Sequence, residues 1–326
     1  MQQRELQLRQ WLAEVIGNTD FMLEPASEDA SFRSYYRLKS KQNTYIVMDA
    51  PPSQEDCEPF VKIQHLLSNN DVNVPQIHAF DKTLGFMLLS DFGNVLFLDV
   101  LNEDSYNHLY SIAIDELLKI QNIVCSEDVP PYNQQLLSNE LALFSDWFIG
   151  KHLGLELNKS QQQVMHNVHE LLIANALAQP KVIVHRDFHS RNIMLLDEKP
   201  GIIDFQDAVL GPLTYDLASL LKDCYISWPE ETIHLLVKQY ISKYNTINQT
   251  ELDFDEFIKW FDLMAAQRHM KAIGIFCRLN YRDSKRKFLY DIPRTLNYLI
   301  ETCNKYPELS DFAQLLSEIQ PKIKNL

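Results

Sequence analysis

Glycine is scarce in this sequence, with only 8 glycines among 326 residues. So few glycines exclude a glycine-rich linker, and the absence of any internal repeat argues against a repeat array. Apolar residues make up 46% of the chain and aromatic residues 11%, which is enough for a folded core and excludes disorder as its main state. A chain of this length predicts one large two-lobed domain or two small domains, because single cores stop growing near ~250–300 residues.

Cysteine pairs and long apolar runs are also missing. The five cysteines are odd in number, scattered, and without metal-ligand or redox spacing, which predicts free, mostly buried thiols in a reducing compartment. No apolar run approaches the ~20 residues that a membrane span needs, and the first ten residues lack an apolar signal region. We therefore expect a cytoplasmic protein without a membrane partner.

Positive charge is the third deficit, since 30 Lys and Arg residues stand against 44 Asp and Glu residues, a net charge of −14. This balance argues against a nucleic-acid partner, because phosphate contacts need Lys and Arg. A nucleotide remains compatible with it, because a metal ion can offset the phosphate charge. Residues 268–294 are the exception, with eight Lys or Arg against two Asp, a local charge of +6.

The hydrophobic pattern changes along the chain. Alternating residues at 32–38 and 44–48, and again at 76–80 and 85–89, predict two β-hairpins. From residue 105 onward apolar residues recur every three or four positions, which predicts helices interrupted only by short β-like runs. The sequence therefore predicts an α+β protein with a small β-rich N-terminal lobe and a larger, mainly helical C-terminal lobe.

One stretch carries recognisable chemistry. His185-Arg186-Asp187, followed by Asn192, fits the catalytic-loop pattern H-R-D-x-x-x-x-N, and Asp204 ends another short apolar run twelve residues later. Phosphoryl transfer needs an oriented acceptor hydroxyl and cations on the phosphates. Asp187 would align the hydroxyl, and Asn192 and Asp204 would give Mg²⁺ the hard oxygen ligands it prefers. A chance turn with a capping Asp204 is the alternative, but the combined spacing favours catalysis.

These motifs resemble those of the aminoglycoside phosphotransferase family, a branch of the kinase-like fold. The family's loop reads H-x-D-x-x-x-x-N before an I-D-[FW] strand end, and His189 and residues 211–218 match its usual continuation. The resemblance implies a protein-kinase-like bilobal fold, with a nucleotide-binding lobe over residues 1–92 and a catalytic and acceptor-binding lobe over residues 93–326. It also implies ATP and Mg²⁺ as cofactors.

The same resemblance suggests further roles. His185 and Asp216 would support the catalytic loop. Asp91-Phe92-Gly93 spells the metal-binding triplet of protein kinases, but it lies far upstream of that loop, so we interpret it as a hinge or turn. Adenine would bind near residues 88–91, which makes Leu89 and Asp91 candidate nucleotide contacts.

The nucleotide-gripping features depart from the family pattern. The expected phosphate-covering turn, residues 24–31, has no glycine, and Met48 or Asp49 stands where the family has a lysine. Arg33 and Arg37 on the neighbouring strand either supply the missing positive charge or lie on a solvated face. The departure keeps open a second class of function, a nucleotide-binding pseudokinase without turnover.

One group within the family shares these departures. Residues 30–36, 48–52, 204–208 and 211–217 resemble the anomeric cell-wall sugar kinases, which phosphorylate C1 of N-acetylmuramate and N-acetylglucosamine. The missing lysine is then a trait of that group. The resemblance implies an N-acetylated amino sugar as acceptor and a role in cell-wall recycling; another small alcohol such as choline, homoserine or an aminoglycoside is the alternative.

The basic segment bears on this choice. Arg268 and Arg278 favour an acceptor with a carboxylate over the cationic choline and aminoglycosides, whereas residues 285–287 fit a solvated turn. His189 and Asp207 lie beside the motif and are further candidates for contact with the acceptor. The oligomeric state is left open by the sequence.

Overall fold

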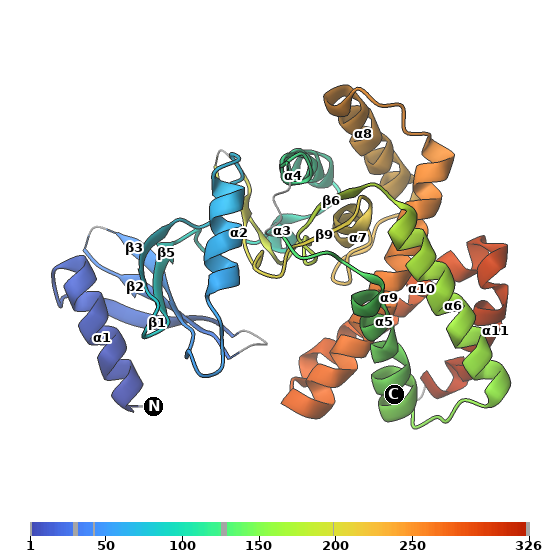
Figure 1. The fold of residues 1–326 in the computed structure, drawn as a ribbon, viewed down its shortest axis with the longest axis horizontal. Helices are drawn as coiled ribbons and strands as arrows, with labels where there is room; N and C mark the ends of the chain where they lie inside the picture. Colours follow the sequence, from blue (N-terminus) through green and yellow to red (C-terminus); the bar gives the residue numbers. More distant parts are fainter. Residues whose placement is uncertain (1, 29–31, 42, 125–128, 198, 324–326) are drawn as a thin grey trace. The chain divides into compact units, whose positions relative to one another are not determined.

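The computed structural model describes residues 2–28, 32–41, 43–124, 129–197 and 199–323. The chain forms two compact units, Met1–Leu96 with Ile193–Asp207, and Phe97–Asn192 with Ala208–Leu326 (Figure 1). The predicted lobes, 1–92 and 93–326, differ from these units because residues 193–207 pack with the N-terminal part. Their assignment to nucleotide and acceptor stays a prediction.

The first unit is built on an antiparallel sheet with the strand order β1-β2-β3-β5-β4. The strands are β1 (Met22–Glu28), β2 (Ser34–Lys39), β3 (Thr44–Asp49), β4 (Ile77–Asp81) and β5 (Phe86–Ser90). Both predicted hairpins are confirmed, as β2 pairs with β3 and β4 with β5. The prediction of a turn at residues 24–31 is wrong for residues 24–28, which lie in strand β1. Residues 29–31 fall outside the described residues.

Strand β1 escapes prediction because its sequence does not alternate. It contains Pro25, and its pairing with β2 shifts register between Pro25 and Ser27. Proline lacks the N–H that a sheet interior requires, but an edge strand with a bulge tolerates it. The partner β2, rather than any local pattern in β1, therefore specifies this strand.

Helix α1 (Gln2–Ile16) covers one face of the sheet. Its apolar side chains Leu8, Trp11 and Leu12 share a core with residues of β2, β3 and β5. Arg4 donates through Nε to Oδ1 of Asp49 at 2.8 Å and through Nη2 to the Leu84 carbonyl at 2.8 Å. Asp49, near the place of the family's lysine, thus anchors α1 to the sheet.

Helix α2 (Glu58–Ser68) and the strand pair β7 (Ile193–Met194) and β8 (Gly201–Ile202) complete the first unit. The Phe60 and Phe205 rings lie 4.9 Å apart, and the Ile202 amide donates to the Asn73 carbonyl at 2.8 Å. A Cβ added to Gly201 would lie 2.5 Å from the Phe92 ring, so the segment before Asp204 fits tightly there. These contacts explain why residues 193–207 join the N-terminal unit.

The second unit is mainly helical around one short strand pair, β6 (Lys181–Val184) with β9 (Val209–Pro212). Its helices are α3 (Phe97–Val100), α4 (Tyr106–Gln121), α5 (Gln134–Leu143), a π-helix (Phe144–His152), α6 (Lys159–Ala178), α7 (Tyr215–Leu221), α8 (Glu230–Asn248), α9 (Phe254–Asp283), α10 (Ile292–Lys305) and α11 (Ser310–Ile323), with short 3₁₀ turns at Arg286–Asp291 and Pro307–Leu309. The predicted helical pattern is confirmed, but strand β9 was not predicted.

Helix α9 packs against α5, α6, α7, α10 and the π-helix, and is buried along most of its length. Gly274 permits one of these contacts, since a Cβ there would lie 2.5 Å from the Leu143 backbone. No helix in the described part of the chain is long and apolar enough to span a bilayer. The thiols of Cys57, Cys224, Cys277 and Cys303 are free and buried, as predicted, whereas Cys125 lies outside the described residues.

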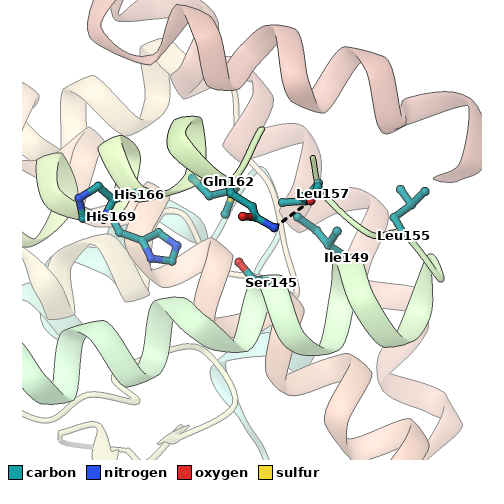
Figure 2. A pocket seen from close by; sticks show the side chains of 8 residues that line it. Ser145, Ile149, Leu155, Leu157, Gln162, His166 and His169 are labelled. Carbon is teal, nitrogen blue, oxygen red and sulfur yellow. Dashed lines mark hydrogen bonds between the residues drawn. The ribbon is translucent and has the colours of Figure 1, made fainter. Parts of the chain in front are cut away.

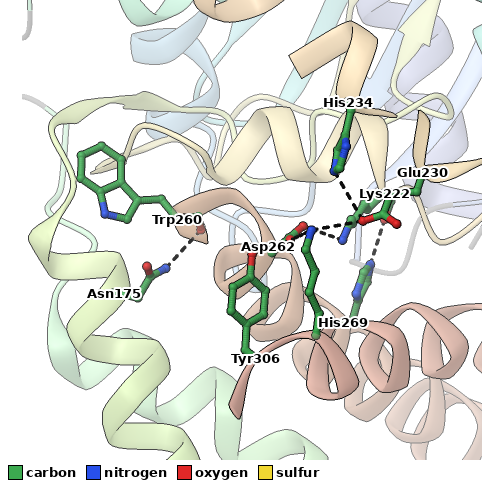
Figure 3. A network of polar contacts seen from close by, with 9 residues as sticks. Asn175, Lys222, Glu230, His234, Trp260, Asp262, His269 and Tyr306 are labelled. Atoms are coloured by element: carbon green, nitrogen blue, oxygen red, sulfur yellow. Dashed lines mark hydrogen bonds and ion pairs between the residues drawn. The ribbon is translucent and has the colours of Figure 1, made fainter. Parts of the chain in front are cut away.

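A buried ion network fixes α9 among its neighbours (Figure 3). Asp262 of α9 accepts from Nζ of Lys222 at 2.8 Å, Nζ of Lys305 at 2.7 Å and the Tyr306 hydroxyl at 2.7 Å. Lys305 also pairs with Glu230 at the start of α8, at 3.1 Å. Burial raises the pKa of Asp262, but the Lys222 charge and the hydrogen bonds outweigh this, so the pKa lies below its usual value.

Replacing Asp262 by alanine is expected to lower the free energy of unfolding by about 3 kcal/mol, because it leaves the largely buried Lys222 ammonium without its acceptor and removes the bonds from Lys305 and Tyr306. The exposed Asp255, on the same helix, is the control, and its alanine variant should lose no more than ~1 kcal/mol. Chemical denaturation followed by circular dichroism measures both. Equal losses in the two variants would contradict the assigned role of the network.

Candidate active site

A buried carboxylate holds the first half of the predicted catalytic loop, which begins where β6 ends. Asp216, in the first turn of α7, accepts hydrogen bonds from the amides of His185 at 2.6 Å and Arg186 at 3.0 Å. Burial raises the pKa of Asp216 to about 7 even though both amides favour the ionised form. Asp216 thus fixes the backbone immediately before Asp187.

A second carboxylate holds the other half of the loop. Asp223, just after α7, accepts through Oδ2 from the Ser190 amide at 3.0 Å and the Ser190 hydroxyl at 2.5 Å. Its Oδ1 atom accepts from the Tyr225 amide at 3.0 Å. Asp223 was not predicted from the sequence; the available signal was an acidic residue two positions after the apolar run of α7. The loop is therefore clamped on both sides of Asp187.

Two residues of the motif adopt backbone conformations that are uncommon outside glycine. Arg186 has φ +76° and Asp204 has φ +65°. Such conformations cost roughly 1–2 kcal/mol for residues with a side chain, and they persist only where surrounding contacts impose them. The hydrogen bonds that the amides of His185 and Arg186 donate to Asp216 supply that constraint for Arg186. Two of the strained backbone positions thus lie within the sequence motif.

Asp187 lies half-buried among cations of its own unit. Burial raises its pKa, but the positive charges of Lys271, Arg186 and Arg268 and the interaction with His189 lower it more, so the pKa lies below its usual value. The carboxylate is therefore ionised at neutral pH. An ionised carboxylate in this position can accept a hydrogen bond from an acceptor hydroxyl.

Glu140 of α5 forms ion pairs with two of these cations, Arg186 and Lys271. Its Oε1 atom lies 2.6 Å from Nη2 of Arg186 and 3.1 Å from Nζ of Lys271, and Lys271 also donates to the Tyr215 hydroxyl at 3.0 Å. The Tyr132 hydroxyl donates to the other carboxylate oxygen. Neither Glu140 nor Lys271 was predicted as a site residue. The position of Lys271, three residues after Arg268 and so on the same helix face, was the available signal.

The predicted metal ligands belong to different units, Asn192 to the second and Asp204 to the first. Asn192 donates through Nδ2 to the Asp187 carbonyl at 3.0 Å, which orients its amide. Asp204 accepts from Nε2 of Gln206 at 2.8 Å. Both offer hard oxygen atoms, which suit Mg²⁺. Among residues 2–28, 32–41, 43–124, 129–197 and 199–323, no group of three or more His, Cys, Asp or Glu side chains is arranged to hold a metal.

Two of the predicted nucleotide contacts bind each other. The Arg37 guanidinium donates to both carboxylate oxygens of Asp91, at 2.7 and 3.0 Å, and also to the Gly93 carbonyl and the Asn94 side chain. Burial raises the pKa of Asp91, but the hydrogen bonds from Arg37 and from the Gly93 amide outweigh this effect. The pKa therefore lies below its usual value. This pair shapes the turn that follows β5.

The remaining predicted nucleotide contacts have other surroundings. Arg33 forms an ion pair with Glu55 at 3.3 Å. The Leu89 side chain is buried within the sheet, where its backbone faces Ile46 on one side and Ile77 on the other. Their contact with a nucleotide stays a prediction.

The predicted acceptor residues are divided between the two units. His189 and Arg268 are close enough to Asp187 for both to affect its pKa. Arg278 lies ten residues further along α9, roughly 15 Å away by helical rise. Asp207 is exposed at the end of the first unit. Within the second unit, the structure thus places His189 and Arg268 nearer to Asp187 than Arg278.

A separate pocket of about 390 Å³ lies in the second unit (Figure 2). It is lined by Ser145 and Ile149 of the π-helix, by Gln162 and His169 of α6, and by neighbouring apolar side chains. Gln162 donates to the Leu157 carbonyl at 2.9 Å along its wall. None of its lining residues was predicted from the sequence, and none belongs to the loop around Asp187.

Glutamine at position 140 should reduce the dependence of stability on acidic pH. Burial raises the pKa of Glu140, but Lys271 and Arg186 lower it more, so the folded pKa lies below the ordinary 4.5. The ionised Glu140 therefore contributes stability above pH 4.5 that is lost as the pH falls through its folded pKa. Thermal unfolding from pH 7 to pH 3 should show a shallower decline for Glu140→Gln than for the exposed control Glu170→Gln. The same slope in both variants would contradict the assigned ion pairs.

The chain has relatives of known name that match it over most of its length. Residues 23–255 match the profile of APH, the phosphotransferase enzyme family. The chain is 44% identical over 299 residues to an N-acetylmuramate/N-acetylglucosamine kinase of Pseudomonas putida, covering 91% of this chain and 88% of that protein. It is 42% identical to a protein of the same name from Neisseria meningitidis serogroup B, covering 97% and 96%.

A solved structure shows the same fold. The choline kinase LicA of Streptococcus pneumoniae superposes with a TM-score of 0.66 at 13% identity, covering 91% of this chain and 99% of that one. The predicted kinase-like fold, with its small sheet and larger helical part, is thereby confirmed. With its family profile, its relatives and its fold in agreement, the chain belongs to the phosphotransferase enzyme family and is a small-molecule kinase.

Proposed function

We propose that this enzyme transfers the γ-phosphoryl group of ATP to the anomeric hydroxyl of N-acetylmuramate and N-acetylglucosamine, in cytoplasmic recycling of cell-wall sugars. The observation that carries the proposal is Asp187, kept ionised by neighbouring cations on a loop clamped by Asp216 and Asp223. The names of the 42–44% identical relatives support the choice of acceptor.

In this reaction Asp187 accepts a hydrogen bond from the C1 hydroxyl of the sugar. As that oxygen bonds to the γ-phosphorus, the bond between the γ-phosphorus and the β,γ-bridging oxygen breaks, ADP leaves, and the hydroxyl proton passes to Asp187. His185 and Asp216 support the loop. Mg²⁺, when bound, neutralises charge on the phosphates, and its protein ligands would be Asn192 and Asp204.

The other proposed contacts divide between nucleotide and acceptor. Arg33 and Leu89 remain candidates for direct nucleotide contact, whereas Arg37 and Asp91 would act by shaping the turn after β5. His189 and Arg268 are the acceptor contacts with structural support, because they lie beside Asp187. Asp207 and Arg278 remain acceptor candidates from the sequence alone. We propose no nucleic-acid or membrane partner.

The alternative acceptors are less consistent with this site. Choline and aminoglycosides are cations, and three cationic side chains, Arg186, Arg268 and Lys271, surround Asp187. Homoserine, with its own carboxylate, is the stronger competitor. A pseudokinase would need neither an ionised Asp187 nor a clamped loop.

Replacing Asp187 by asparagine should lower kcat by about 10²–10⁴-fold, because the amide cannot take the hydroxyl proton. ADP release is measured with Mg-ATP against N-acetylmuramate, N-acetylglucosamine, choline, homoserine and kanamycin, with ATP affinity measured separately. We expect turnover with the two amino sugars, and unchanged ATP affinity in the variant. The exposed Asp255→Asn serves as control. Nucleotide binding without turnover on any acceptor would favour the pseudokinase.

Asp204→Asn tests the metal assignment. Loss of one carboxylate ligand should raise the Mg²⁺ concentration for half-maximal activity by about tenfold or more. Binding of Mn²⁺ in the presence of ADP, followed by electron paramagnetic resonance, should weaken in parallel. Asp197→Asn, an exposed position in the same unit, is the control. Unchanged metal affinity in the Asp204 variant would remove this residue from the metal site.

A further inference from the structure

Arg268 is a buried cation without a countercharge in contact. Its side chain, on α9, is only 8% exposed, and its guanidinium carbon lies 5.0 Å from the centre of the Tyr215 ring. Within the described part of the chain its Nε has no hydrogen-bond partner, and its guanidinium forms no ion pair. Buried guanidinium groups are normally paired, because they stay charged and have five N–H donors to satisfy.

The other cations beside Asp187 show the usual arrangement. Arg186 and Lys271 both bind Glu140, at 2.6 and 3.1 Å, and Lys271 also binds the Tyr215 hydroxyl. Arg268 lies one helical turn before Lys271 and is close enough to influence Asp187 and Asp216, yet it shares neither contact. Of these three cations, Arg268 is therefore the one without a carboxylate in contact within the described residues.

A second unpartnered group lies beside the same carboxylate. The Nδ1 atom of His189 is buried and lacks a hydrogen-bond partner within the described residues. Burial lowers the pKa of His189, so its ring is neutral at pH 7, and its edge packs on Tyr225 at 5.3 Å between ring centres. Two unsatisfied polar groups next to Asp187 indicate a binding site for a polar ligand.

We propose that Arg268 binds a carboxylate carried by the acceptor, so that the enzyme favours an acidic amino sugar over its neutral counterpart. This inference rests on the proposed function. A guanidinium binds a carboxylate through two parallel hydrogen bonds, and the contact is strong where water is excluded. N-acetylmuramate carries such a carboxylate on the lactyl ether at O3, and N-acetylglucosamine has a hydroxyl there.

The two sugars form a matched pair of ligands for the test. Arg268→Gln removes the charge, Arg268→Lys keeps the charge without the planar fork, and Arg282→Gln alters an exposed arginine on the same helix. The kcat and KM for both sugars are measured at pH 8 in each variant. Arg268→Gln should raise KM for N-acetylmuramate about 10- to 100-fold and leave that for N-acetylglucosamine within about twofold. Arg268→Lys should be intermediate and Arg282→Gln unchanged.

Thermal stability separates binding from a structural role. Because Arg268 makes no hydrogen bond or ion pair in contact within the described residues, the melting temperature of Arg268→Gln should stay within about two degrees of the wild type. A fall of several degrees, or an equal loss of kcat with both sugars, would show that Arg268 serves the fold or the transferred phosphoryl group, and would overturn the proposal. Equal KM values in wild type and Arg268→Gln would overturn it as well.

Binding without turnover keeps this inference distinct from the proposed reaction. Calorimetric titration of Asp187→Asn, with and without Arg268→Gln, gives the affinity for each sugar. Tighter binding of N-acetylmuramate that depends on Arg268 supports the inference even if no phosphate is transferred. Equal binding of the two sugars, or no binding of either, contradicts it. Failure of the proposed function alone would appear as selective binding without turnover in the wild type.

Discussion

The site depends on one contact, the acceptance of two successive backbone amides by the buried carboxylate of Asp216. These bonds hold Arg186 in a left-handed conformation, and that conformation turns the chain from β6 into the loop that presents Asp187. Asp223 holds the loop in a similar way on the other side of Asp187, because it accepts hydrogen bonds from the amide and hydroxyl of Ser190. Asp216 lies in the first turn of the short helix α7 and Asp223 lies just after its end, so one rigid element positions both halves of the loop.

The positive charges around Asp187 are also held by a shared partner. Arg186, next in sequence, and Lys271, from distant α9, share the single carboxylate of Glu140. This arrangement provides positive potential beside Asp187 without leaving those two cations unpaired in the interior. Arg268 departs from it, and for that reason it is the cation best able to respond to a ligand.

The sequence predicted what depends on local pattern and on the spacing of the motif. Alternation located both hairpins, helical spacing located the long helices, and the loop pattern located Asp187, Asn192 and Asp204. What it missed depends on contacts between distant residues. Strand β1 exists because β2 pairs with it. Glu140 and Lys271 lie 46 and 85 positions from Arg186 in the sequence. Asp223 lies 33 positions from Ser190, which it binds. Likewise, only the fold reveals that Arg37 and Asp91 bind each other.

The packing of α9 has a consequence for how this enzyme can change. The helix is fixed by the Asp262 network, by the close approach of Gly274 to Leu143, and by burial along most of its length. A shift of the whole helix would disturb all of these contacts together. New acceptor preferences should therefore evolve by exchange of side chains at positions such as 268, on a helix that itself stays in place.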